Sequence, residues 1–249
     1  MRRLVSALAL SCAVALPVQA LDLESLSESD RAAFRAEIRA YLLDNPEVLL
    51  EAMQVLEGRE AEARAAADRT LVEVNRAALM EDEDDWRGGN PDGDMTIVEF
   101  VDYRCGYCKR AQPEITGLIE DDGSIVLIRK ELPILGEDSV LASRFAIATK
   151  LVAGEEAYAG VSDALMALRG GISEDSLTQM ANTFGLDADA IMAEIDSDAV
   201  SKIIAENHLL AQRLQIQGTP AFVVGGELLR GYLPQEQMAA IVDQERARD

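Results

Sequence analysis

The sequence predicts an α/β protein in which helices cover both faces of a mixed sheet. Two apolar runs rich in β-branched residues, 96–101 and 125–129, are typical of buried strands. A hairpin is predicted from strands 221–224 and 227–230, which are joined at a Gly-Gly turn. Between the second strand and the hairpin, residues 138–216 show only helical patterns, so we expect a packed helical subdomain there. A helix from Leu233 to Arg246 closes the chain.

Residues 1–20 predict a secretory signal peptide. An arginine pair, a short apolar run and a small-x-small cleavage site ending at Ala20 follow one another. Cys12 leaves with this segment, so the mature chain keeps Cys105 and Cys108. Lipidation of Cys12 is the weaker alternative, because the three residues before it fit a lipobox poorly. We therefore expect export to the periplasm, where disulfides form and persist.

Residues 21–80 predict a helical extension. Its apolar residues recur at helical spacing, and Asn45-Pro46 should separate two helices. The apolar face carries too little bulk to fold alone, so it packs on its own domain or on copies of itself. The acidic and turn-rich stretch 81–95 then predicts a linker, which Trp86 anchors to the domain.

The charge of the chain limits the classes of partner. The formal net charge is −22 at pH 7. Such an acidic protein is repelled by nucleic acid and by anionic lipid, so neither is expected as a partner. Solubility is the simplest reason for this charge.

The pair Cys105 and Cys108 organises the rest of the chain. Two cysteines three apart at the start of a helix share one face, which allows the short separation that a disulfide requires. Unpaired N–H groups and the helix dipole favour a thiolate at Cys105, and a thiolate is the species that attacks disulfides. The pair therefore predicts thiol–disulfide exchange without a metal or an organic cofactor.

Two other interpretations of the cysteine pair are weaker. A zinc site requires about four ligands, and the mature chain adds only His208, about a hundred residues away. A purely structural disulfide would close a very small loop and would constrain the unfolded chain little. His208 itself is expected to be an ordinary surface or packing histidine.

Glu99 is the only charged residue in the central strand. A carboxylate on a buried strand must be paired or protonated, and buried carboxylates cluster at functional sites. We interpret Glu99 as a proton acceptor for the sulfur of Cys108; the alternative is a strand-edge glutamate that meets solvent or a lysine. Asp102 should point to the other face as a solvated residue, and Pro113 should kink the helix that follows the cysteines.

A family resemblance rests on two motifs. The run 98–109, with sequence VEFVDYRCGYCK, and the Gly-Thr-Pro of residues 218–220 together resemble the DsbA family, especially the secreted group that includes ScsC and Com-type proteins. The resemblance implies a thioredoxin fold over 96–249, with the helical subdomain 138–216 inserted into it. It also implies that the extension 21–80 can form a homo-oligomer, a trimer in ScsC-like proteins.

The resemblance also implies roles for individual residues. Cys105 would be the exposed nucleophile and Cys108 the buried resolving thiol. Pro220 would be a cis proline opposite them, and Glu99 the buried acidic residue of the fold. Substrate contacts would come from Thr219, Gly106 and Tyr107.

The direction of the reaction stays open. Strongly oxidising DsbA enzymes carry Pro-His between the cysteines, whereas this chain has Gly106-Tyr107, which implies a weaker oxidant. Thr219 before the proline resembles isomerases, so an oligomeric protein would favour isomerisation. The expected partners are cysteine-containing proteins or peptides and a membrane partner that recycles the pair. A non-enzymatic scaffold or chaperone and a glutathione-using relative are the rival hypotheses.

Overall fold

The computed structural model describes residues 27–248, which divide into two compact units between Arg59 and Glu60. The first unit contains α1 (Glu28–Asp44) and the first part of α2 (Glu47–Val74). Ser27 caps α1 by accepting the Asp30 N–H at 3.2 Å. The predicted signal peptide and Cys12 lie outside the described residues.

The apolar side chains of the first unit are exposed in the single chain. None of the residues of α1 is buried. The large exposed side chains of this unit are Phe34, Ile38, Tyr41, Leu43, Leu49, Leu50, Met53, Val55 and Leu56. This unit therefore leaves an apolar surface without cover from its own residues.

The second unit is built on a five-stranded mixed sheet with the order β1-β3-β2-β4-β5. Its strands are β1 (Trp86–Gly89), β2 (Met95–Val101), β3 (Ile125–Glu131), β4 (Ala221–Val224) and β5 (Glu227–Arg230). β2 and β3 are parallel and all other neighbours are antiparallel. The predicted mixed sheet is thus confirmed, and both strands of the predicted hairpin have the expected bounds.

Helices cover both faces of this sheet, because its strands alternate apolar side chains between them. α4 (Gly106–Asp122) and α10 (Gln235–Arg246) pack on the face that carries Ile97. α3 (Arg76–Met80), α9 (Asp198–Arg213) and the end of α2 pack on the face that carries Val98.

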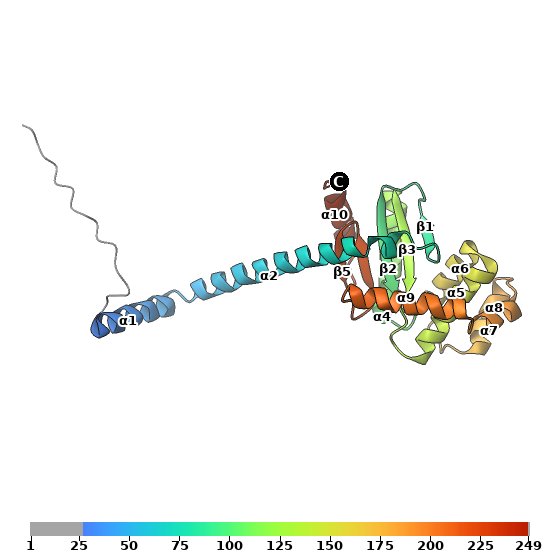
Figure 1. Cartoon of the computed structure of the whole chain (residues 1–249), viewed down its shortest axis with the longest axis horizontal. Coiled ribbons are helices and arrows are strands. Elements are labelled where there is room, and N and C mark those ends of the chain that lie inside the picture. Colours follow the sequence, from blue (N-terminus) through green and yellow to red (C-terminus); the bar gives the residue numbers. More distant parts are fainter. Residues whose placement is uncertain (1–26, 249) are drawn as a thin grey trace, which may run out of the picture. The chain divides into compact units, whose positions relative to one another are not determined.

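A helical subdomain lies beside the sheet (Figure 1). It consists of α5 (Glu137–Ala153), α6 (Glu155–Ala167), α7 (Glu174–Thr183), α8 (Ala188–Glu194) and α9. Its core also contains Val101, Tyr103 and both cysteines, so the cysteine pair lies where the subdomain meets the sheet. The helical subdomain that the sequence predicts for residues 138–216 is thus confirmed.

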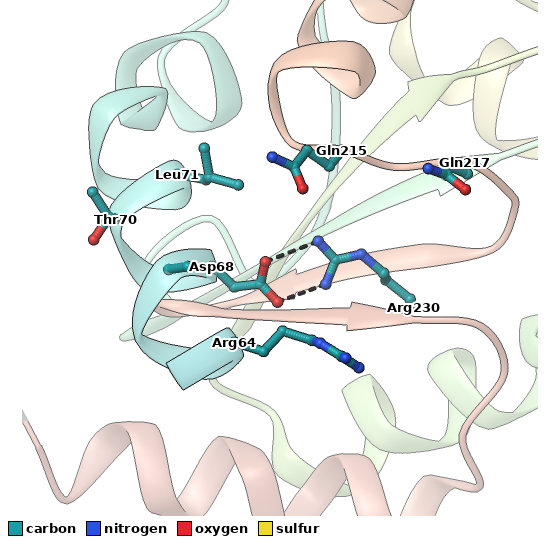
Figure 2. A pocket seen from close by; sticks show the side chains of 8 residues that line it. Arg64, Asp68, Thr70, Leu71, Gln215, Gln217 and Arg230 are labelled. Atoms are coloured by element: carbon teal, nitrogen blue, oxygen red, sulfur yellow. Dashed lines mark hydrogen bonds and ion pairs between the residues drawn. The ribbon is translucent and has the colours of Figure 1, made fainter. Parts of the chain in front are cut away.

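The last turns of α2 belong to the second unit, although the sequence analysis assigned residues 21–80 to the extension. Asp68 accepts two hydrogen bonds from the Arg230 guanidinium, at 2.6 and 2.8 Å (Figure 2). Arg69 bonds Glu245 at 2.7 Å, and Val72 is buried. A cavity of about 930 Å³ borders this contact and is lined by Arg64, Ala67, Asp68, Thr70, Leu71, Gln215, Gln217 and Arg230 (Figure 2). Neither cysteine lines it.

The segment expected to be a linker contains a strand. β1 pairs antiparallel with β3, and the Trp86 Nε1–H donates to the Glu155 carbonyl at 3.1 Å. The predicted anchoring role of Trp86 is therefore confirmed, whereas the assignment of the whole stretch 81–95 as a linker is not. β3 also runs two residues beyond the predicted Arg129. Within residues 27–248, none of the helices has the length and apolar character that a membrane crossing requires.

Candidate functional site: the Cys105–Cys108 dithiol

Cys105 occupies the N-cap position of α4. Its backbone is extended, with φ −73° and ψ 116°, and its Sγ accepts the Cys108 N–H at 3.4 Å. The sulfur therefore takes the place that a serine or aspartate oxygen takes in an ordinary cap. No disulfide joins Cys105 to Cys108.

The two sulfurs differ in accessibility. Cys105 keeps 7% of its surface exposed and Cys108 none. The expectation of an exposed Cys105 is thus met only in comparison with Cys108. A reagent from solvent can approach Cys105 first, and Cys108 can act only on a partner already attached there.

The proline loop meets the cysteine pair as the resemblance implies. The Thr219–Pro220 peptide bond is cis, and Pro220 is buried. The Cys105 thiol donates to the Thr219 carbonyl oxygen at 3.1 Å. Residues 114 positions apart in the chain are therefore in direct contact at the sulfur.

The surroundings separate the acidities of the two thiols. The hydrogen bond from the Cys108 thiol is the largest cause that lowers the pKa of Cys105 to about 5, and partial burial opposes it. The N–H groups of Cys108 and Tyr107 lower this pKa further. The pKa of Cys108 is raised far above its usual range, first by its hydrogen bond to Cys105 and then by burial. Cys105 is therefore a thiolate at neutral pH while Cys108 keeps its proton.

The side chain of Thr219 is close enough to both sulfurs to lower the pKa of each thiol. Its Oγ1 is nevertheless buried without a hydrogen-bond partner of normal geometry among the described residues. Its contribution is therefore secondary to the bond between the two thiols.

Glu99 is fully buried and paired with an arginine. The Arg129 Nε–H donates to Glu99 Oε2 at 3.1 Å, and the two residues face each other across β2 and β3. The other carboxylate oxygen, Oε1, is buried without a partner in the described part of the chain. Arg129 also bonds Gln112 of α4 at 3.1 Å, so the pair lies on the α4 face of the sheet. The alternative of a solvent-facing Glu99 is wrong.

Asp102 was expected to be solvated, and that expectation is wrong. Its side chain is fully buried and accepts four hydrogen bonds. The donors are the backbone N–H groups of Arg104, Ile134 and Leu135 and the hydroxyl of Ser139. β2 ends at Val101, so the two-residue alternation that suggested an outward side chain no longer applies at Asp102. Asp102 instead ties the turn before Cys105 to the loop after β3.

The family models agree with this geometry. The model described as "DSBA-like thioredoxin domain" matches residues 96–243, which is more than half of the chain. The chain belongs to the DsbA-like thioredoxin family. The model described as "Copper resistance protein ScsC N-terminal domain" matches residues 30–63, within the first unit and the start of the second.

Solved structures support the same family. A thioredoxin-like oxidoreductase from Silicibacter pomeroyi is 38% identical, with a TM-score of 0.66, and the match covers 70% of this chain and 98% of that one. A linker-deletion variant of Proteus mirabilis ScsC is 27% identical, with a TM-score of 0.68. This match covers 92% of this chain and 100% of that one.

The curated relatives are much longer proteins. A Na(+)/H(+) antiporter, NhaA 3 of Salinispora tropica, is 26% identical over 191 residues, which are 77% of this chain and 29% of the antiporter. The chain thus spans less than a third of the length of the curated relatives it matches.

This DsbA-like domain carries a second buried polar cluster, which the sequence analysis missed. Glu131 accepts the hydroxyls of Tyr103 and Tyr158, both at 2.6 Å, and of Ser143 at 2.7 Å. Burial raises the pKa of Glu131, and the three hydroxyls oppose that rise. The four residues come from β3, α5, α6 and the turn before Cys105. The cluster therefore fixes the helical subdomain against the sheet beside the dithiol.

The two residues between the cysteines of the DsbA-like motif face solvent. A Cβ built on Gly106 would meet nothing within 4 Å, and Tyr107 is 59% exposed. Both are therefore accessible to a substrate that reaches Cys105. His208 is half-buried on α9, as an ordinary packing residue would be.

Proposed function

We propose that the protein is a thiol–disulfide oxidoreductase that acts on cysteine-containing proteins or peptides through Cys105 and Cys108. The observation that carries this proposal is the contact of Cys105 Sγ with both the start of α4 and the carbonyl of Thr219 in the cis-proline loop. At the start of α4, the hydrogen bonds from the Cys108 thiol and from the N–H groups of Cys108 and Tyr107 lower the pKa of Cys105, and Cys108 stays protonated nearby.

The exchange proceeds in two steps. The Cys105 thiolate attacks one sulfur of a substrate disulfide, so that a mixed disulfide forms and the other substrate sulfur leaves as a thiolate. Cys108 then loses its proton and attacks Cys105 Sγ, which releases the second substrate thiolate. The substrate gains two electrons, and the dithiol loses two as it becomes a disulfide. The reverse sequence oxidises a substrate dithiol.

Isomerisation uses only the first step. A second thiolate of the same substrate attacks the mixed disulfide, which forms a new substrate disulfide and returns Cys105 as a thiolate. No net electrons are transferred to the substrate in this case.

We assign Glu99 the role of receiving the proton that Cys108 loses. Support comes from its complete burial on the α4 face of the sheet and from the unpaired Oε1 atom. Backbone groups of Thr219 and Pro220 and the exposed Gly106 and Tyr107 are assigned to substrate contact.

The protein is proposed to form a homo-oligomer, which the family resemblance makes a trimer. In that state, isomerisation is the favoured reaction. The exposed apolar residues of the first unit and the ScsC N-terminal match support self-association. Leu50→Glu tests it in the full chain, because Leu50 is 62% exposed and its loss should not disturb a monomer. Light scattering should show a lower mass for Leu50→Glu than for the neighbouring control Glu51→Gln. A monomeric mass for the control Glu51→Gln would contradict the oligomer.

The proposed location is the periplasm, with a membrane protein recycling the dithiol. The basic, apolar and small-x-small pattern of residues 1–20 supports export. Mature protein recovered from the periplasm should begin at Leu21.

An insulin-reduction assay, together with refolding of scrambled ribonuclease, tests the activity. Cys105→Ser should abolish turnover, and Cys108→Ser should accumulate mixed disulfides with substrate. Turnover that persists without Cys105 would contradict the proposal. A non-enzymatic scaffold would show no cysteine-dependent turnover, and a glutathione-using relative would keep its activity in Cys108→Ser.

A further inference from the structure

Basic side chains surround the dithiol of an otherwise acidic protein. The chain has 45 acidic and 23 basic side chains, yet Arg104, Lys109 and Arg110 flank the cysteines. The acidic residues of the same stretch, Glu99 and Asp102, are buried and bonded internally. Three positively charged side chains therefore lie on either side of the dithiol in the sequence, within a chain whose net charge is −22.

Arg110 is held between two aromatic rings. Its guanidinium carbon lies 5.4 Å from the ring centre of Tyr107 and 5.6 Å from that of Tyr232. Both distances are within the range of cation–π attraction. Arg110 is exposed, and no hydrogen bond among residues 27–248 uses its N–H groups, so a carboxylate can accept two of them.

The nearby carboxylate of Glu114 is already engaged. Its Oε1 accepts the Tyr232 hydroxyl at 2.8 Å, and its Oε2 accepts the Gln235 backbone N–H at 2.9 Å. Among the ion pairs of residues 27–248, none within 4 Å involves Arg110. Arg110 thus lies beside Tyr107 without a direct ion pair, although Glu114 keeps its own negative charge because these two hydrogen bonds lower its pKa.

The other two basic residues add to the same field. The Lys109 ammonium donates to the Leu168 carbonyl, and its pKa is lowered first by burial and then by the charge of Arg104. Arg104 has only a long, exposed contact with Asp138, at 3.7 Å. Their fields reinforce that of Arg110 for any group that approaches Cys105.

We propose that Arg110, held between Tyr107 and Tyr232, makes the enzyme select substrate disulfides that lie next to aspartate or glutamate side chains. This inference rests on the proposed oxidoreductase function and adds its substrate class. The occupant is an acidic peptide segment, since the N–H groups of the exposed Arg110 guanidinium match a carboxylate.

The test uses three peptides that share one intramolecular disulfide and carry Asp, Ser or Lys beside both cysteines. The full-length protein is assayed at low salt with reduced glutathione as the electron donor, and kcat/KM is measured for each peptide after subtraction of the uncatalysed rate. An exposed ion pair changes an equilibrium by a few-fold, so we expect a ratio of about ten between the Asp and Lys peptides when attraction and repulsion combine. The ratio should approach one in about 1 M salt, where the Debye length is about 3 Å.

Variants then assign the preference to Arg110. Arg110→Gln should lower the Asp-to-Lys ratio about threefold, and Arg110→Lys should lower it less, since it keeps the charge but loses the planar edge. The control Arg76→Gln removes the same charge from an exposed residue of α3, on the opposite face of the sheet, and should keep the ratio.

Two results would overturn the inference while leaving the proposed function intact: equal kcat/KM for the Asp and Lys peptides, or a ratio that Arg110→Gln does not change. Failure of all three peptides to react, with insulin also unreduced, would instead remove the oxidoreductase function and the inference with it.

Discussion

Replacement of Asp102 by alanine removes one carboxylate that four hydrogen-bond donors share. The bonds from the backbone N–H groups of Arg104, Ile134 and Leu135 measure 2.7, 2.8 and 3.0 Å, and that from the Ser139 hydroxyl measures 2.8 Å. All four bonds are accepted by a buried carboxylate. Hydrogen bonds to an ionised group are stronger than hydrogen bonds between two neutral groups.

The expected loss of stability follows from what each donor can do afterwards. Ser139 is fully buried, so its stranded hydroxyl costs about 2 kcal/mol. Ile134 and Leu135 are exposed, and Arg104 is too, so water can replace part of the lost bonds at about 0.5–1 kcal/mol each. The sum predicts that Asp102→Ala lowers the free energy of unfolding by about 4 kcal/mol.

Urea unfolding at one fixed redox state measures this loss. The control Asp138→Ala removes another carboxylate of the same region, but that residue has only an exposed 3.7 Å contact, so it should cost under about 1 kcal/mol. Hydrogen exchange should also lose protection at the amides of Ile134 and Leu135 in Asp102→Ala alone. The reasoning is refuted if Asp102→Ala matches the control in stability and keeps both amides protected.

Three further predictions concern the dithiol and the ion pair next to it. Cys108→Ala removes the main hydrogen-bond donor to the Cys105 sulfur. Since a hydrogen bond to a charged group is worth about 1.5–3 kcal/mol, the pKa of Cys105 should rise from about 5 by about 1–2 units. A Cys108→Ser hydroxyl can still donate and should shift that pKa less; an unchanged midpoint in Cys108→Ala would count against this account of the acidity. Arg129→Met leaves the buried Glu99 carboxylate unpaired and should cost about 3–5 kcal/mol in urea unfolding, most of it recovered when Glu99→Leu is added. A double variant no more stable than Arg129→Met would exclude the ion-pair explanation. Because the pKa of Cys105 is depressed in the folded protein, the reduced form should gain stability as the pH rises from about 5 to about 8.5 and lose it as the pH falls. Cys105→Ala should not show this gain, and equal pH dependence of the two proteins would contradict it.

Local signals in the sequence predicted most of the second unit. The hairpin was found because Pro220 and the Gly-Gly turn limit where its strands can begin and end. β1 was missed because two of its four residues are glycines, so it carries little strand propensity of its own. It forms because β3 supplies a partner edge, which is a tertiary effect.

The site was predictable where a motif fixes it and unpredictable where distant residues complete it. The helical pattern that follows the cysteine pair placed Cys105 at a helix start. The pairing of Glu99 with Arg129 depends on the parallel register of two strands, which the sequence does not state. The convergence of Tyr103 and Tyr158 on Glu131 depends on how the helical subdomain docks, so no spacing rule could reveal it.

The central claim is that Cys105 reacts as a thiolate far below the pH at which a free cysteine does. The direct measurement is the rate at which the reduced protein reacts with dithiodipyridine, a small disulfide, from pH 4 to pH 9. A lower pKa raises the thiolate fraction but weakens each thiolate, so at pH 7 the rate should be about that of a free cysteine. At pH 5.5 it should be about 20-fold faster, since about three quarters of Cys105 and about 0.1% of a free thiol are ionised. The account predicts a single ionisation with a midpoint near pH 5 that disappears in Cys105→Ser, and a midpoint near pH 8.5 would contradict it.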